Sequence, residues 1–206
     1  MRIEDLRTEK NQDRSRIEAT IVWEDSDRGR QDIYFETTND FADGLTLGPH
    51  PFLLAGIMPA LEFGEKRILV KENVCPELKK NLMNALRLIG YWYYGQAHEM
   101  IRLEANCIEV PALIYNRRNA GSFFSGGVDS YATLVQNHVS IPASHPSSIK
   151  DAFMVYGNNI ESDNRPESFD RAFNELSPVL SRKGINLIPV YTNVRELEGG
   201  TKFFLE

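Results

Sequence analysis

The sequence predicts an α/β protein in which a parallel sheet, built in the order strand–helix–strand–helix–strand, is preceded by a smaller α+β domain. Two observations lead to this prediction. From residue 118 onward, short apolar segments alternate with longer amphipathic ones, which is the order that produces parallel strands joined by helices. Before that point the order is irregular, with strand-like segments on both sides of an apolar helical one. We therefore expect an α+β domain at 1–117 and a parallel-sheet domain at 118–206, with the boundary near 115–119.

The composition indicates a globular chain with a buried core. It has 206 residues, 42% hydrophobic content and a formal net charge of −6. Because an acidic chain has no general positive field, we expect no general nucleic-acid binding. The charged N-terminus and the lack of a long apolar run favour a cytoplasmic protein without a membrane segment. Cys75 and Cys107 are far apart in the sequence, which argues against a disulfide scaffold and for a reducing compartment.

Two strands and a short helix are expected first. The segments 17–24 ("IEATIVWE") and 32–36 ("DIYFE") are rich in β-branched and aromatic residues and flank a polar turn, which predicts a hairpin. Within 43–65, Pro51 can open a short helix and Pro59 can end it.

The clearest helical pattern lies at 73–95, between expected strands at 66–72 and 100–105. Pro76 suits the first helical position, and Gly95 can end the helix. One face carries apolar residues at three- and four-residue spacings, namely Leu78, Leu82, Leu86, Ile89, Trp92 and Tyr93. The aromatic cluster at 91–94 indicates packing in a core or an interface, with ligand stacking as the alternative.

The second domain follows the alternating pattern closely. Strands are expected at 121–124, 151–157 and 185–192, and helices at 128–138 and 165–184, the latter capped by Gly184. The segment 140–150 is an ordinary surface connection.

The stretch "SGGVDS" at 125–130 lies where the first of these strands ends and a helix begins. Ligands bind at the carboxyl ends of parallel strands, and free N–H groups at a helix start attract anions. Gly126 and Gly127 let the backbone approach a phosphate, while Ser125 and Ser130 add hydroxyl groups. We expect both phenylalanines before the turn to be buried, Ser125 to Gly127 to form a turn with free N–H groups, and the helix to start at Val128 or Asp129. The alternative is a purely structural turn in which Asp129 interacts with the helix dipole.

All five fixed positions of this stretch match SGGxDS, and in this it resembles the signature of the PP-loop ATP pyrophosphatases, the adenine nucleotide alpha-hydrolase-like superfamily. The phosphate loops GxxxxGK[ST] and GxGxxG are absent. Within that superfamily, "FFSGGVDSYATL" is most similar to proteins related to 7-cyano-7-deazaguanine synthase. The zinc-binding cysteines of those synthases and the glutaminase domain of related synthetases are missing. The resemblance implies a five-stranded sheet, of which only three strands can be counted, so the domain is either incomplete or reduced.

The resemblance also implies a ligand and a reaction. PP-loop enzymes bind ATP with Mg²⁺ and adenylate a substrate oxygen with release of pyrophosphate, as ligases and synthases do. On this basis the pyrophosphate portion is held by Ser125, Gly126, Gly127 and Ser130, and Asp129 orients the metal. Adenine is lined by Met154, Val155 and Tyr156, and the nucleotide is faced by Thr192 and Asn193. The substrate, which is a small molecule or a macromolecule, and the general base are not identified by the sequence.

Other candidate residues give weaker signals. The four histidines, His50, His98, His138 and His145, show no metal-ligand spacing. Arg195 follows a strand and could reach a phosphate, but Glu196 and Glu198 beside it favour a surface ion pair. A rival hypothesis from another class is a non-catalytic interaction module, in which the aromatic cluster at 91–94 contacts a partner protein or a second copy in a homo-oligomer.

Overall fold

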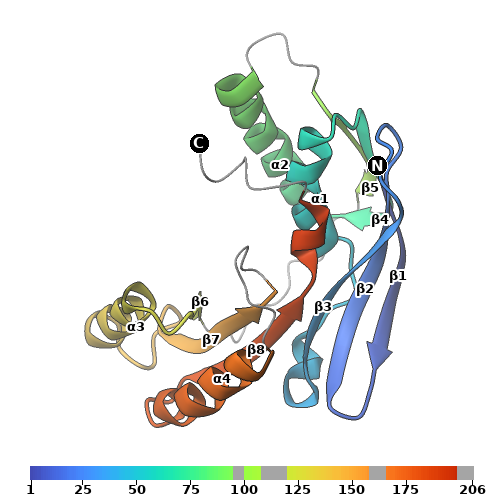
Figure 1. Cartoon of the computed structure of the whole chain (residues 1–206). Helices are drawn as coiled ribbons and strands as arrows, with labels where there is room; N and C mark the ends of the chain where they lie inside the picture. Colours follow the sequence, from blue (N-terminus) through green and yellow to red (C-terminus); the bar gives the residue numbers. More distant parts are fainter. Residues whose placement is uncertain (95–99, 108–119, 158–165, 199–206) are drawn as a thin grey trace.

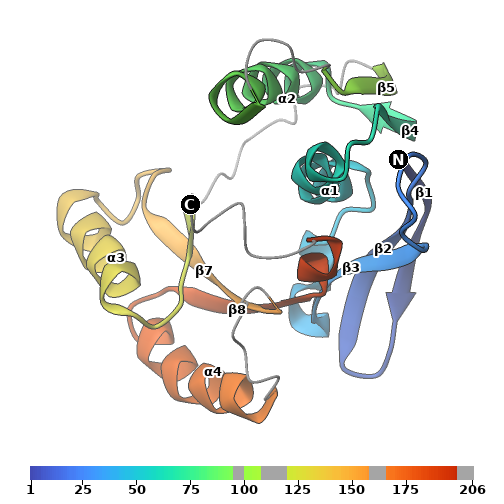
Figure 2. The same ribbon diagram turned by 45° about the horizontal axis from the view of Figure 1, so that its top comes forward.

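The computed structural model describes residues 1–94, 100–107, 120–157 and 166–198, and these residues build one mixed sheet with helices on both faces (Figures 1 and 2). The eight strands lie in the order β5-β4-β1-β2-β3-β8-β7-β6. Their bounds are β1 Arg2–Lys10, β2 Arg14–Val22, β3 Gln31–Thr38, β4 Arg67–Val74, β5 Arg102–Cys107, β6 Ala120–Phe123, β7 Ile149–Tyr156 and β8 Asn186–Thr192. The expected α/β class is therefore confirmed.

The α-helices are α1 His50–Glu62, α2 Pro76–Ile89, α3 Val128–Ser140 and α4 Pro166–Ser181. Short 3₁₀ turns occupy Asn39–Gly44 (η1) and Val194–Leu197 (η3), and a π-helical turn at Gly90–Tyr94 (η2) extends α2. Pro51 and Pro76 lie at the starts of their helices as predicted, and Gly184 adopts the left-handed φ expected of a C-terminal cap, at +70°. Gly95 lies outside the described residues. None of the described helices is both long and apolar enough to cross a membrane.

The C-terminal half has the predicted order β6-α3-β7-α4-β8. β6 pairs with β7 and β7 pairs with β8, both in parallel. β8 then pairs antiparallel with β3, which joins these three strands to the five from the N-terminal region. The predicted hairpin of β2 and β3 is also present, in a continuous antiparallel register.

The hydrophobic core lies on both faces of this continuous sheet. On β3, Ile33 and Phe35 pack in a cluster with α1 and α2, whereas Tyr34 packs in a second cluster with α3 and α4. Since neighbouring residues of a strand point to opposite faces, α1 and α2 cover one face and α3 and α4 cover the other. Figure 2 shows this division, with α1 and α2 on one side of β8 and α4 on the opposite side. The expected domain boundary near 115–119 lies outside the described residues.

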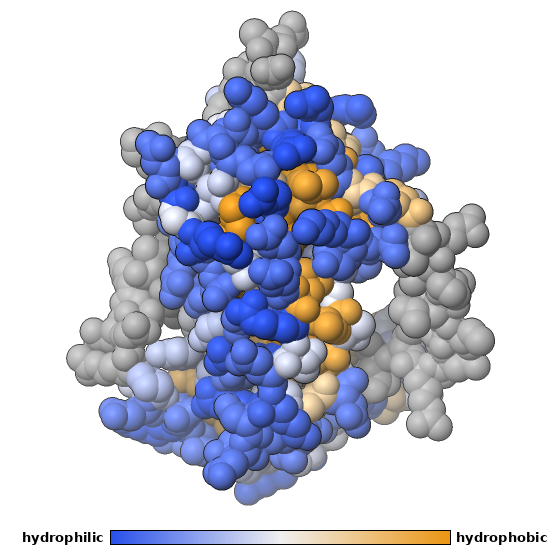
Figure 3. Space-filling view, turned by 90° about the vertical axis from the view of Figure 1, so that its right-hand side faces the viewer, coloured by the Kyte–Doolittle hydropathy of each residue, from blue (hydrophilic) through white to orange (hydrophobic). Residues whose placement is uncertain are grey.

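The N-terminal strand β1 is a feature that the sequence reading missed. Its charged side chains hid its strand character, but Ile3 is buried and the strand lies between β2 and β4. The α-ammonium group of Met1 is buried beside the carboxylate of Glu65 and donates a 2.8 Å hydrogen bond to the carbonyl of Arg67. On the side of the molecule where β1 lies, the surface is mostly hydrophilic with a hydrophobic strip in its middle (Figure 3). An antiparallel sheet tolerates such a solvated face.

Two local expectations are wrong. Pro59 does not end its helix but lies inside α1, which continues to Glu62. Its position in the last turn costs only one helical hydrogen bond, and its ring is buried. The two phenylalanines at the end of the short strand are not both buried: Phe124 is 2% exposed and packs in the cluster with α3 and α4, but Phe123 is 77% exposed because it points to the opposite face, outside both core clusters.

Position 157, directly after β7, requires glycine because the backbone there passes very close to the last residue of β8. Its φ is +93°, and a Cβ atom added there would lie 1.8 Å from the carbonyl oxygen of Thr192. We expect Gly157→Ala to lower the free energy of unfolding by at least about 3 kcal/mol, through both strain and overlap with a backbone atom. Chemical denaturation measures this loss.

Gly184→Ala is the matched control for this substitution. Gly184 also has a positive φ, at +70°, but nothing lies within 4 Å of its added Cβ. It should therefore lose only about 1 kcal/mol, from the backbone conformation alone. Equal losses at the two positions would contradict the close approach of Gly157 to β8.

Candidate functional site

The SGG turn, defined as Ser125–Ser130, joins the carboxyl end of β6 to the first turn of α3. The helix begins at Val128, as predicted, with Gly127 as its N-cap residue. Gly126 has a φ of +77°, which favours glycine, and its added Cβ would lie 3.2 Å from Leu176 of α4. The glycines therefore let the chain reverse closely against α4.

The backbone amides of this turn are available to a ligand. No side chain caps α3, and the amide of Gly127 makes only a long 3.4 Å bond to the hydroxyl of Ser125. Within the described part of the chain, no acceptor is bonded to the amides of Gly126, Val128, Asp129 or Ser130. Such a row of N–H groups at a helix start has the geometry to bind an anion.

The side chains of the SGG turn fall into two kinds. The hydroxyl of Ser130 donates a 2.8 Å bond to the carbonyl of Gly127, which stabilises the turn, while Ser125 is exposed. Asp129 is exposed in the first turn of α3. Within the described ranges no group of three or more His, Cys, Asp or Glu residues can hold a metal ion. Mg²⁺ commonly uses one or two carboxylates together with phosphate oxygens, so Asp129 suits a metal that arrives with its ligand.

The residues expected around adenine lie at the end of β7, next to the strand that leads into the turn. Met154 is buried in the cluster under α3 and α4, and Val155 points to the opposite face of the sheet. Tyr156 makes ring contacts with Phe169 of α4 and Tyr191 of β8, at centroid distances of 5.4 Å and 6.0 Å. Only the backbone of this strand end and the partly exposed Val155 and Tyr156 are thus accessible.

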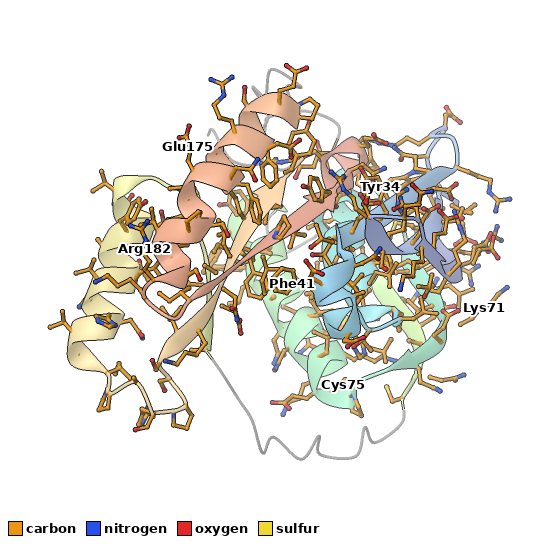
Figure 4. All side chains as sticks on the ribbon, turned by 90° about the horizontal axis from the view of Figure 1, so that it is seen from below. Tyr34, Phe41, Lys71, Cys75, Glu175 and Arg182 are labelled. Carbon is orange, nitrogen blue, oxygen red and sulfur yellow. The ribbon has the colours of Figure 1, made fainter. Side chains whose placement is uncertain are left out.

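Thr192 and Asn193, at the end of β8, have side chains that already bond to β3. The hydroxyl of Thr192 donates a 2.7 Å bond to the carbonyl of Tyr34, and the amide of Asn193 donates a 2.8 Å bond to the carbonyl of Asp32. The backbone N–H of Tyr34 returns a 3.0 Å bond to Asn193. Tyr34 lies where β3 meets β8 (Figure 4). What these residues can offer a nucleotide is therefore mainly their backbone.

A charged cluster beside this junction was missed in the sequence. The buried carboxylate of Glu36 accepts bonds from Arg14 at 3.0 Å and Arg16 at 2.8 Å. The Arg14 guanidinium lies 3.7 Å from the ring centre of Tyr191, and that of Arg16 lies 4.1 Å from the ring of Tyr34. Burial raises the pKa of both tyrosines above the ordinary value. The spacing of Arg14 and Arg16 places both on one face of β2, which was the sequence pattern that could have indicated the cluster. The pattern predicts an ion pair only once β3 is known to be the neighbouring strand.

The remaining candidates do not join the SGG turn. His50 accepts a 3.0 Å bond from the amide of Cys75, and His145 accepts one from the amide of Ser147 at 3.1 Å. Arg195 forms an ion pair with Glu198, as the neighbouring acids suggested. His98 lies outside the described residues.

No family model, curated protein or solved structure matches this chain. The site is therefore judged on its own geometry. That geometry brings together the five predicted binding residues of the turn and places the ends of β7 and β8 along the same edge of the sheet.

If the turn binds anions through its amides, the carboxylate of Asp129 should oppose a metal-free anion. We expect Asp129→Asn to tighten binding of pyrophosphate without Mg²⁺ by about three- to fivefold, because removing a like charge about 5 Å away in water is worth about 0.8 kcal/mol. Amide chemical shifts of Gly126 to Ser130 during a pyrophosphate titration would measure this. Shifts elsewhere in the chain but none in the turn would contradict the assignment.

Proposed function

We propose that this protein binds ATP together with Mg²⁺ at the SGG turn and adenylates a substrate oxygen with release of pyrophosphate, in the manner of the PP-loop enzymes. The observation that carries the proposal is the row of unbonded amides at the start of α3, formed by a sequence that matches SGGxDS at every fixed position. A purely structural turn needs neither the row of free amides nor the acidic residue beside it.

The electrostatics of the turn favour a polyphosphate that carries a cation. The chain has a net charge of −6, and within the turn itself the positive potential comes from backbone N–H groups. Asp129 would repel a bare phosphate, whereas it would attract a phosphate-bound Mg²⁺. When bound, Mg²⁺ supplies charge neutralisation to the pyrophosphate as it leaves.

The residues of the chain have separable roles in this proposal. Amides of Gly126, Gly127 and the first turn of α3 hold the pyrophosphate portion, with the hydroxyls of Ser125 and Ser130 beside them. Asp129 would hold Mg²⁺. The end of β7, at Met154 to Tyr156, supplies an apolar edge for adenine, and the backbone at Thr192 and Asn193 borders it from β8. We propose the reaction only by class, as the chemistry of a 7-cyano-7-deazaguanine synthase-like enzyme or of another AMP-forming ligase.

Calorimetry with ATP tests the proposal directly. We expect binding in the presence of Mg²⁺ and a loss of about tenfold or more in affinity for Asp129→Ala, since one metal ligand is removed. Asp43→Ala, at an exposed carboxylate in η1, is the matched control and should leave affinity unchanged. Without Mg²⁺ the effect of Asp129→Ala should reverse in sign. ATP that fails to bind, or that binds Asp129→Ala and wild type alike, overturns the proposal.

A second candidate is a non-catalytic interaction module, and one observation favours it. Tyr91 and Trp92, on the π-helical turn after α2, are 61% and 66% exposed, and Leu88 of α2 is exposed beside them. Exposed aromatic clusters are typical of protein interfaces.

This candidate predicts association through the aromatic turn in place of ATP binding. Sedimentation velocity over a concentration series should show self-association of the wild type that the double substitution Tyr91→Ser, Trp92→Ser abolishes. Val135→Ser, at an exposed apolar residue of α3, is the control. If the wild type stays monomeric at every concentration, the aromatic cluster does not serve self-association.

A further inference from the structure

The fold brings together the two cysteines, which are 32 positions apart in the sequence, from residue 75 to residue 107. Cys75 is the N-cap residue of α2, directly after β4, and Cys107 is the last residue of β5. In the parallel pairing of these strands, Val74 is the register partner of Cys107. With strands about 4.8 Å apart and one further residue along the chain, the Cα atoms of Cys75 and Cys107 lie on the order of 6 Å apart. Disulfides span Cα distances of this size.

Both cysteines lie where α2 begins, beside the end of β5. On β5, Leu103 and Ala105 pack in the core beneath α2, and Cys107 follows at the same alternation. Lys79, one helical turn after Cys75, donates a 3.1 Å bond to the carbonyl of Ala105. Since residues four apart share a helix face, the side of α2 that carries Cys75 faces β5.

Both thiols are free and can be reached by a reagent. Cys107 is exposed and Cys75 is partly exposed (Cys75 is labelled in Figure 4). The backbone at Cys75 is held in place, because its amide donates to the imidazole of His50 in α1 at 3.0 Å. One partner is therefore accessible for the first reaction, and the other is positioned for the second.

We infer that Cys75 and Cys107 form a reversible intramolecular disulfide when the protein meets a low-molecular-weight disulfide such as glutathione disulfide. In the first step a cysteine thiolate attacks the oxidant, forms a mixed disulfide and releases one glutathione thiolate. In the second step the other cysteine thiolate attacks the mixed disulfide and releases the second glutathione. The protein loses two electrons and two protons, and glutathione disulfide becomes two glutathione thiols.

The cross-link would tie the start of α2 to the end of β5. The register of β4 and β5 is irregular between Val70 and Val74, so the pair at Val74 and Cys107 is an isolated contact that the disulfide would fix covalently. This modification site involves none of the residues proposed to bind ATP, and it stands or falls independently of that proposal.

Exposure of the whole chain to glutathione disulfide, followed by intact mass measurement and non-reducing peptide mapping, tests the inference. Wild type should lose both free thiols and the mass of two hydrogens, yield a peptide linking Cys75 to Cys107, and recover fully with dithiothreitol. In Cys75→Ser and Cys107→Ser the second step is impossible, so the glutathione adduct should accumulate to at least about ten times its level in wild type.

The peptide map of the wild type does not depend on how well either variant folds. Wild type that carries glutathione on both cysteines, that links only between two chains, or that keeps either thiol unreacted in the folded state overturns the inference. A yield of the linked peptide that is independent of protein concentration supports it.

Discussion

The junction between β3 and β8 is the contact on which the rest of the structure depends. Only two residue pairs form its ladder, Phe35 with Thr192 and Glu36 with Tyr191, yet it makes one sheet of two strand sets. Side chains supply what so short a ladder lacks. Thr37 donates a 2.7 Å bond to the carbonyl of Pro189, and Glu36 holds two arginines that stack on tyrosines from both strands. A buried carboxylate with two guanidinium partners is costly to leave unpaired, so the junction favours one register.

This junction also decides what borders the candidate site. Because β3 runs antiparallel to β8, its amino-terminal end lies at the carboxyl end of β8, beside the ends of β7 and β6. The N-terminal region therefore borders the end of the parallel strands, which is where such sheets bind ligands. The side chains of Thr192 and Asn193 bond to β3 and hold this border in place. The SGG turn follows β6, the outermost strand and two strands away from β8, and within the described residues its amides have no strong acceptor.

Local patterns predicted the elements of the C-terminal half well, since each strand and helix there has its own apolar period and its own glycine or proline boundary. They failed where a residue's role depends on distant partners. Phe123 looks like core because it is an apolar residue in a short strand, but it points to the face of β6 opposite Phe124, outside both core clusters. β1 looks like a solvated segment because its charges pair across strands, as Arg7 does with Glu18. Cys75 and Cys107 likewise become neighbours only through the pairing of β4 with β5.

The geometry of the SGG turn was predictable for a related reason: it depends on the backbone of one continuous stretch. A turn that must present N–H groups needs glycine where φ is positive, as at Gly126, and needs a helix that starts without a side-chain cap, as at Gly127. Both requirements are written into six adjacent residues and need no distant partner. Recognition of the base and of a second substrate depends on side chains from several elements. The side chains of Thr192 and Asn193 are already hydrogen-bonded to the backbone of β3. The phosphate-binding part of the proposed function can therefore be argued from sequence, whereas the choice of substrate must be measured.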